Sequence, residues 1–109
     1  MNTATAATQF EFHGISVNPT IGAVHVDGDA VELTHMEFDL LLLFVTHPGE
    51  TLHRDRILKN LRGIDAAIVT RSVDVLVGRL RRKLSDSGRN PRFIRTVWGS
   101  GYAFIANPN

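Results

Sequence analysis

The chain contains no cysteine, which excludes disulfide bonds, thiolate catalysis and cysteine-ligated zinc. This absence also fits the reducing conditions of the cytoplasm, where we expect the protein to be located. No apolar run approaches the about 18 residues that a membrane-spanning helix needs, so we expect no membrane segment. Residues 1–9 lack the basic and apolar regions of a secretory signal.

Sequence patterns of enzymes and metal sites are also missing. Neither Ser72 with Asp74 nor Ser100 has the context of a nucleophilic triad. Gly99-Ser100-Gly101 lacks the third glycine of a dinucleotide-binding loop. The histidines are dispersed, and none is expected to pair with another ligand at helical i, i+3 or i, i+4 spacing: His13, His25, His35, His47 and His53. We therefore expect no metal, no cofactor and no enzymatic activity.

The small net charge of +1 conceals a strong charge separation along the chain. Residues 71–95 carry eight basic and two acidic side chains, a net charge of +6, whereas all other residues together sum to −5. The overall composition, with a net charge near zero, does not by itself explain such a separation. It predicts a polyanionic partner for the basic segment.

The N-terminal part of the chain predicts an antiparallel sheet. Residues 1–8 are rich in alanine and threonine without periodicity, and are expected to form a linker or disordered arm before one domain over residues 9–106. Four short apolar segments follow, over residues 10–12, 15–17, 23–26 and 30–33. Asp27-Gly28 between two of them is typical of a tight hairpin turn. We predict four strands.

Three helices and a β-hairpin are predicted after the sheet. Thr34 and Glu37 have the spacing of a capping box, which starts a helix that His47-Pro48-Gly49 ends. Leu33 and Phe38 flank its start as a hydrophobic staple. A second helix is expected over residues 54–61 and a third over 70–84. Strands over 93–97 and 102–105 would flank a glycine-rich hairpin tip.

The third predicted helix has one apolar face and one basic face. Val73, Leu76, Val77, Leu80 and Leu84 recur at helical spacing and predict the buried stripe. A helical wheel places Arg71, Val75, Gly78 and Arg82 on the opposite face, with Ser72 and Arg79 on one flank and Asp74 and Arg81 on the other. Arginine beside small residues suits a nucleic-acid groove. Thr70 would cap this helix, where free amides bind phosphate.

Two motifs resemble the DNA-binding effector domain of OmpR/PhoB-type response regulators. They are RSVDVLVGRLRRKL at residues 71–84 and IRTVWGSGYAF at residues 94–104. The similarity extends over most of residues 10–105 and includes LTHMEFDLLLLFVTHPG at 33–49 and HRDRIL at 53–58. It implies an α+β winged helix-turn-helix: an N-terminal four-stranded antiparallel sheet, a three-helix core and a C-terminal hairpin wing.

The resemblance also implies a function and partners. The expected function is sequence-specific binding of double-stranded DNA by a transcription regulator of a two-component system. An upstream receiver domain, phosphorylated by a kinase, would control it, and two copies would bind tandem direct-repeat half-sites. The loop 62–69 matches a segment that contacts RNA polymerase in some members, although its apolar residues would equally pack against the core.

The resemblance and the wheel together assign residues to DNA contacts. Base-reading residues are expected to be Val75, Arg79, Arg81 and Arg82, although the wheel places Arg81 on the flank. Backbone contacts are expected from Thr70, Arg71, Ser72, Arg95, Thr96, Gly99 and Tyr102. Two departures put wing and backbone contacts in question, because Trp98 and Arg62 stand where the family often has arginine and tryptophan, respectively.

Two other functions compete with duplex binding. Trp98, Tyr102 and Phe104 beside Arg95 could form a stacking platform for single-stranded nucleic acid or RNA, although such platforms usually contain more aromatic residues. A protein-interaction domain is the second alternative, and it would leave the charge of +6 without a purpose. Competition between duplex and single strands separates the first two functions.

Overall fold

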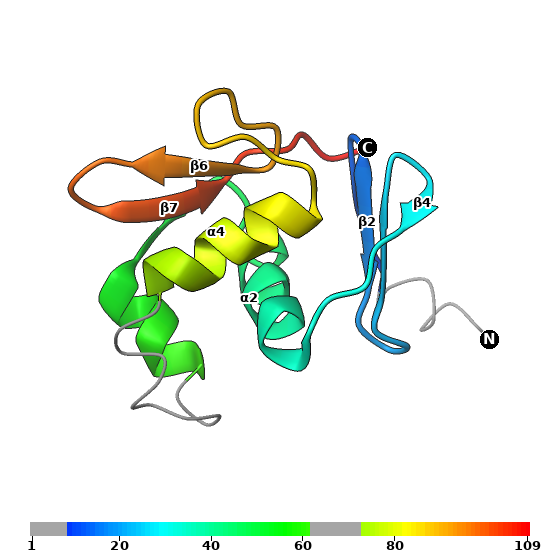
Figure 1. Cartoon of the computed structure of the whole chain (residues 1–109), viewed down its shortest axis with the longest axis horizontal. Helices are drawn as coiled ribbons and strands as arrows, with labels where there is room; N and C mark the ends of the chain where they lie inside the picture. The colour runs from blue at the N-terminus through cyan, green and yellow to red at the C-terminus, as the bar shows by residue number, and fades with distance from the viewer. Residues whose placement is uncertain (1–8, 62–72) are drawn as a thin grey trace.

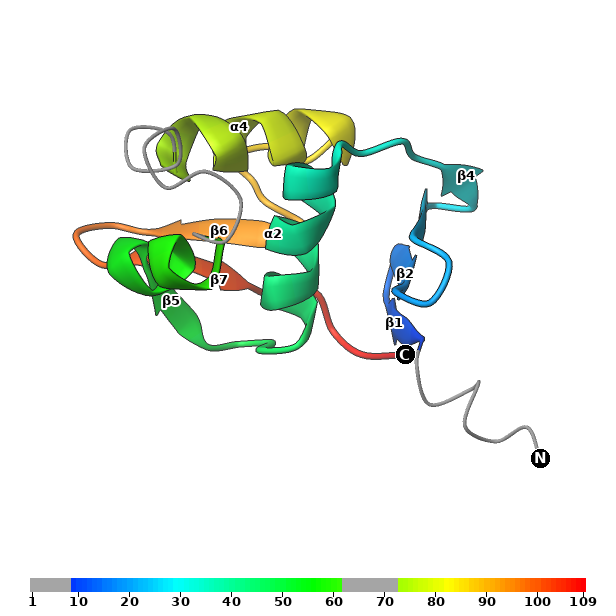
Figure 2. The same ribbon diagram turned by 90° about the horizontal axis from the view of Figure 1, so that it is seen from below.

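The computed structural model describes residues 9–61 and 73–109, which form two small antiparallel sheets and three helical segments. The N-terminal sheet lies at one end of the molecule, and α2 stands between it and the remaining helices (Figures 1 and 2). The second sheet lies against α2 and α4, on the side of α2 that faces away from the N-terminal sheet. The predicted α+β winged helix-turn-helix is confirmed.

The N-terminal sheet has the order β1-β2-β3-β4. The strands are β1 (Phe10–Phe12), β2 (Ile15–Asn18), β3 (Ala23–Val26) and β4 (Asp29–Ala30). Asp27 and Gly28 both have positive φ, 51° and 88°, as the predicted tight turn requires. The four predicted strands are present, but the predicted bounds of the fourth, 30–33, were wrong. The turn pairs Val26 with Asp29, so β4 begins there and ends at Ala30 as the chain turns toward the helix.

Helix α2 (His35–Val45) begins as the sequence predicts. The Thr34 hydroxyl accepts a hydrogen bond from the Glu37 amide, and the Glu37 carboxylate accepts one from the Thr34 amide. Residues 54–61 are also helical, and they bury Ile57 and Leu61. These helices and α4 (Val73–Lys83) pack around Leu40, Leu41, Phe44, Val77 and Leu80, all fully buried. The core therefore fixes the direction of α4.

The wing belongs to a three-stranded sheet of order β5-β7-β6. Its strands are β5 (Thr51–His53), β6 (Ile94–Val97) and β7 (Gly101–Phe104). The two hairpin strands lie within one residue of their predicted bounds. Strand β5 was not predicted, because three residues are too few to show an alternating pattern. It pairs with β7 and connects the wing to the segment between α2 and residues 54–61.

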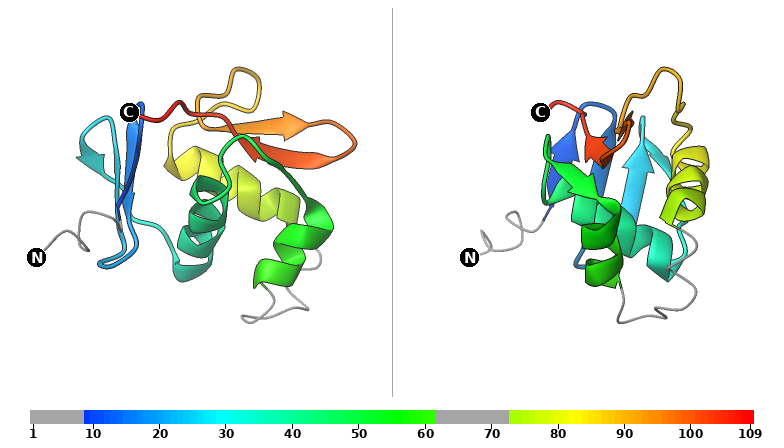
Figure 3. Two further views of the ribbon diagram at one scale, coloured as in Figure 1. Left: turned by 180° about the vertical axis from the view of Figure 1, so that it is seen from behind. Right: turned by 90° about the vertical axis from the view of Figure 1, so that its left-hand side faces the viewer.

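The C-terminal segment returns to the N-terminal sheet, as the views from behind and from the side show (Figure 3). The His13 amide donates to the Asn107 carbonyl at 2.8 Å, and Pro108 bridges Phe12. The rings of Phe12 and Phe104 meet edge to face at 4.9 Å between centroids. On the same side, Arg92 forms a two-bond ion pair with Asp27. These contacts hold both sheets in one body.

Candidate nucleic-acid interface

Helix α4 presents its polar face to solvent, in the orientation that the apolar stripe predicts. Val73, Leu76, Val77 and Leu80 are buried, with exposed fractions of at most 6%. On the opposite side Arg79 and Arg82 are exposed, and Val75 is 52% exposed although it is aliphatic. A Cβ atom added to Gly78 would meet nothing within 4 Å. This outer face, formed by Val75, Gly78, Arg79 and Arg82, has little bulk in its N-terminal half and two guanidinium groups in its C-terminal half.

The predicted contacts at the helix start lie outside the described residues. They are Thr70, Arg71 and Ser72. The loop 62–69 and the departure at Arg62 also fall outside. The roles assigned to these residues stay predictions.

Arg81 does not join the outer face. Its guanidinium turns toward the wing, where Nη2 donates to the Ile94 carbonyl at 2.8 Å and to Thr96 Oγ1 at 2.8 Å. Nε donates to the same Ile94 carbonyl at 3.2 Å. The helical wheel, which places Arg81 on the flank, therefore describes its position better than the major-groove role that the resemblance implies.

Tyr102 is 5% exposed and lies between the wing and α4. Its hydroxyl donates to Asp74 Oδ1 at 2.5 Å, and Arg54 Nε donates to the same oxygen at 2.9 Å. The hydrogen bond from Tyr102, aided by Arg54, lowers the pKa of the Asp74 carboxyl, although partial burial opposes the shift. Burial and the bond to Asp74 raise the pKa of Tyr102. Both groups therefore keep this donor–acceptor arrangement at neutral pH.

The wing offers a cation, a hydroxyl and an exposed indole. Arg95 is exposed on β6, and Thr96 is half-buried beside it. The Thr96 hydroxyl accepts from Arg81, and a hydroxyl that accepts one bond still has a proton to donate. Gly99, with φ of 79°, forms the tip, closed by a bond from the Ser100 amide to the Val97 carbonyl. Trp98 beside it is 89% exposed.

A second cationic group lies where the C-terminal end of α4 meets the start of α2. Lys83 Nζ donates to Glu37 Oε1 at 2.9 Å, and the Glu37 side chain is buried. Burial acts to raise the pKa of Glu37, but hydrogen bonds from Thr34 and Lys83 outweigh it and lower that pKa. Glu37, Lys83, Arg79 and Arg82 line a hollow of about 250 Å³. Because Glu37 compensates the charge of Lys83, the positive charge of this hollow comes from Arg79 and Arg82.

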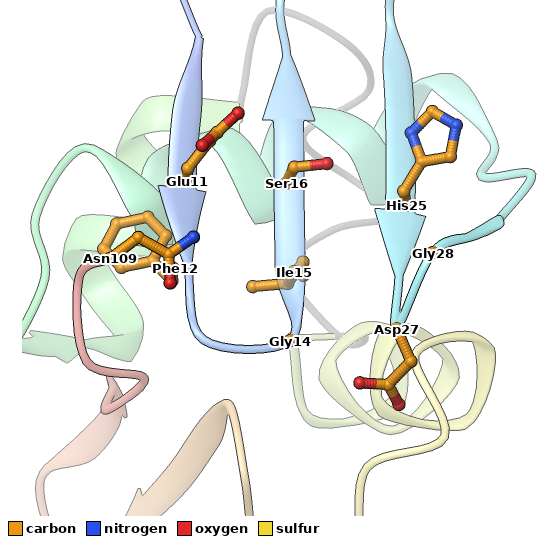
Figure 4. A pocket seen from close by; sticks show the side chains of 9 residues that line it. All are labelled: Glu11, Phe12, Gly14, Ile15, Ser16, His25, Asp27, Gly28 and Asn109. Carbon is orange, nitrogen blue, oxygen red and sulfur yellow. The ribbon is translucent and has the colours of Figure 1, made fainter.

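The outer face of the N-terminal sheet carries a different, mixed surface. Glu11, Ser16 and His25 stand in register on three neighbouring strands and line an open hollow of about 460 Å³ (Figure 4). Asp27 and Asn109 border it. Among the described residues no three His, Asp or Glu side chains gather closely enough to hold a metal ion. The hollow therefore has no ligand set for a cation.

One expectation about the histidines was wrong. His35 Nε2 lies 3.3 Å from Asp39 Oδ2, at i, i+4 spacing on α2. The His35 side chain is 82% exposed, and two ligands do not make a metal site. The pair is a surface contact on the first turns of the helix.

Sequence patterns did not identify Arg54 or the Lys83–Glu37 pair as parts of this surface. Arg54 contacts Asp74 from 20 positions away, and Lys83 contacts Glu37 from 46 positions away. No periodicity connects residues so far apart. An ion pair across the fold is visible only when both elements are in place.

Among residues 9–61 and 73–109, no helix is long and apolar enough to span a membrane.

The comparisons with known proteins agree with this geometry. Residues 28–104 match the family described as "Transcriptional regulatory protein, C terminal". The transcriptional regulatory protein AruR of Pseudomonas aeruginosa is 47% identical over 79 residues, which cover 72% of this chain and 32% of AruR. RstA of Escherichia coli is 39% identical over 93 residues, covering 85% of this chain and 39% of RstA. The chain thus spans about a third to two fifths of these relatives.

Solved structures show the same fold. The DNA-binding domain of Klebsiella pneumoniae RstA, in complex with the RstA box, superposes with a TM-score of 0.80 at 39% identity, covering 89% of this chain and 96% of that one. The C-terminal effector domain of BfmR from Acinetobacter baumannii gives a TM-score of 0.76 at 36% identity, covering 94% of each chain. The chain therefore belongs to the family of C-terminal DNA-binding domains of OmpR/PhoB-type transcriptional regulatory proteins.

Proposed function

We propose that this chain binds double-stranded DNA in a sequence-specific way, with α4 in the major groove and the wing on the adjacent backbone and minor groove. The observation that supports this most directly is the outer face of α4. There, Arg79 and Arg82 are exposed next to Gly78, and Val75 lies about one turn nearer the N-terminal end of the helix. Guanidinium groups bond guanine edges and phosphates, and small residues let a helix approach the bases closely.

The two elements have different tasks in this proposal. Arg79, Arg82 and Val75 on α4 discriminate between base pairs, because only base edges differ between sequences. Arg95, Thr96 and the Gly99 backbone bind phosphates and add affinity without discrimination. Thr70, Arg71 and Ser72, at the predicted start of the same helix, are proposed to add further phosphate contacts.

The relatives also suggest how the domain is used. Because the matched relatives are transcriptional regulatory proteins that extend well beyond the matched region, we propose that this domain is the output part of a cytoplasmic response regulator. An upstream receiver domain would control it through phosphorylation, and a second copy would occupy the next direct-repeat half-site. Contact with RNA polymerase through residues 62–69 belongs to this proposal as well.

Salt titration tests whether the partner is a polyanion. Each phosphate contact releases condensed counterions, so about five contacts give a log–log slope of about −4 to −5 for a duplex. Fluorescence anisotropy of a labelled duplex, selected by this chain from a random pool, provides the affinities. A slope near zero would instead favour a protein partner.

Alanine substitutions test the division of tasks. Arg79→Ala is expected to cost about 1–3 kcal/mol on the selected duplex and less on a scrambled one, so discrimination falls. Arg95→Ala is the matched control, because an exposed wing arginine that binds phosphate should weaken both duplexes equally. Loss of discrimination in Arg95→Ala, with Arg79→Ala unaffected, would invert the assignment.

The structure weakens the single-strand alternative. Of the three aromatic side chains that could stack on bases, Tyr102 and Phe104 are buried and only Trp98 is exposed. Successive bases need several exposed aromatic faces. We therefore expect unlabelled duplex to compete much better than single strands of the same sequence.

A further inference from the structure

Three side chains assigned to DNA contacts, those of Arg81, Thr96 and Tyr102, are connected by contacts within the protein. Arg81 of α4 donates to Thr96 and to the Ile94 carbonyl, both on β6. Its guanidinium carbon lies 5.4 Å from the centroid of the Tyr102 ring, within the range of a cation–π contact. Tyr102 in turn donates to Asp74 at the start of α4.

These contacts fasten the wing to α4 at two separate places. Asp74 lies in the first described turn of α4 and holds Tyr102 of β7. Arg81 lies seven residues later, about 10 Å further along the helix axis, and holds β6. The wing strands also pack against the core of α4 through Ile94 and Phe104, both fully buried. Two polar contacts this far apart add to that packing and define the angle between the helix and the exposed part of the wing.

Arg54 strengthens the first of these fastenings. Its Nε donates to the Asp74 oxygen that accepts from Tyr102, and its guanidinium carbon lies 5.5 Å from the same ring centroid. The negative charge of the Asp74 carboxylate is therefore compensated by Arg54 within the protein, although Asp74 lies on the basic helix. An uncompensated carboxylate there would repel a nucleic-acid backbone.

We propose that Arg81 and Tyr102 are positioning residues, which hold the wing at the angle that lets it reach the DNA backbone beside the groove occupied by α4. Arg81 acts through Ile94 and Thr96 rather than by touching DNA. The proposal rests on the proposed function, because a wing angle matters only when helix and wing bind one duplex. It replaces the base-reading role of Arg81 and the phosphate-binding role of Tyr102.

Methionine substitutions at neighbouring positions separate positioning from contact. Arg81→Met and Arg82→Met each remove one cation from α4 and keep a flexible, helix-compatible side chain. Arg82 is exposed on the outer face, so Arg82→Met is expected to reduce the magnitude of the salt slope by about 0.9. Arg81→Met is expected to lower affinity for every duplex by about tenfold, because the displaced wing loses its phosphate contacts, and both this loss and any change of slope should shrink when Arg95→Ala has already removed the cation of the wing.

The outcomes distinguish this inference from the proposed function. If the unmodified chain binds no duplex, the proposed function fails. If it binds and Arg81→Met reduces affinity and slope as much in an Arg95→Ala background as in the unmodified chain, Arg81 itself touches phosphate and the positioning role is wrong. An unchanged affinity in Arg81→Met would overturn it equally. Stoichiometric titration far above the Kd gives the active fraction of each variant, which corrects for any unfolded protein.

A double substitution tests whether the two residues act together. Tyr102→Phe removes the bond to Asp74 but keeps the ring. If both residues hold one angle, the double variant Arg81→Met/Tyr102→Phe should bind about as weakly as the weaker single variant, because either change frees the wing. If the loss of affinity in the double variant equals the product of the losses in the two single variants, each residue makes an independent contact with DNA. That result would contradict the proposal.

Discussion

At the scale of single residues, Trp98 has the most unusual surroundings. Its indole is 89% exposed at the wing tip, and it is the single tryptophan of the chain. An uncharged ring cannot exploit the negative potential of a narrow minor groove as arginine does. We therefore infer that the tip makes an apolar contact with the sugar edge of the duplex and contributes little sequence discrimination.

Tryptophan fluorescence reports this contact directly. Duplex binding is expected to quench the Trp98 emission and to reduce its accessibility to a soluble quencher, because the indole leaves water. Anisotropy of the labelled duplex, followed in the same titration, shows when binding is complete. Full binding with unchanged quencher accessibility would mean that the wing tip stays in solvent.

Glu37 is a residue whose charge is used for folding rather than for DNA. Its buried carboxylate caps α2 and accepts from Lys83, and its pKa is lowered in the folded protein. Because the pKa of Glu37 is lower in the folded than in the unfolded protein, the ionised carboxylate stabilises the fold at any pH above the ordinary glutamate pKa of about 4.3. That stabilisation is lost as the pH falls through the lower folded value.

Substitution with glutamine tests this pH dependence. Glu37→Gln keeps a side chain suited to the capping box but removes the charge that Lys83 pairs with. We expect it to lower the free energy of unfolding by about 1–2 kcal/mol at neutral pH. Urea titrations at neutral and acid pH should show this difference shrinking as the pH falls. A difference that is constant with pH would mean that only the hydrogen-bond geometry matters.

At the scale of elements, Gly101 decides how β5 and β7 come together. A Cβ atom at this position would lie 2.1 Å from the Leu52 carbonyl oxygen and 3.0 Å from the His53 Cα. Both atoms belong to the β5 backbone, which cannot rotate away as a side chain can. The wing therefore depends on the absence of a side chain at the first residue of β7.

Alanine at Gly101 is expected to separate the two strands. Gly101→Ala should lower the free energy of unfolding by about 1–3 kcal/mol through steric overlap. Gly78→Ala is the control, because its Cβ would meet open space and alanine favours a helix by about 1 kcal/mol. Chemical denaturation of both variants measures the contrast. Equal stability of Gly101→Ala and the unmodified chain would show that β5 yields without cost.

At the scale of the whole molecule, exposed acidic and basic side chains gather at different ends, and Arg92 of the basic segment is an exception because it pairs with Asp27. Arginines lie on α4 and the wing, whereas the N-terminal sheet presents Glu11, Asp27 and Asp29 among its exposed residues. These acidic side chains therefore gather at the end of the molecule opposite the wing (Figure 1).

We expect the free chain to be monomeric and to pair only on tandem half-sites. Sedimentation velocity at micromolar concentration should give one monomeric species without DNA, and two copies per duplex when two half-sites are present. A duplex with one half-site scrambled serves as the control and should carry one copy. A stable dimer of the free chain would contradict this prediction.

The sequence by itself determined the local structure and the family. The capping box of Thr34 and Glu37, the Asp27-Gly28 turn and the apolar stripe of α4 each involve residues a few positions apart. Such patterns depend on residues that are close in sequence, so the local structure that they form can be predicted without knowing the rest of the fold. The order of elements and the two quoted motifs then identified a winged helix.

Only the tertiary structure decided where individual charged side chains point. Arg81 turns to a strand 13 to 15 positions away, Tyr102 reaches Asp74 across 28 positions, and Arg92 meets Asp27 across 65. Strand β5 likewise forms because β7 offers it a partner. A long flexible side chain takes whichever partner packing brings within about 3 Å, and sequence periodicity carries no information about that distance.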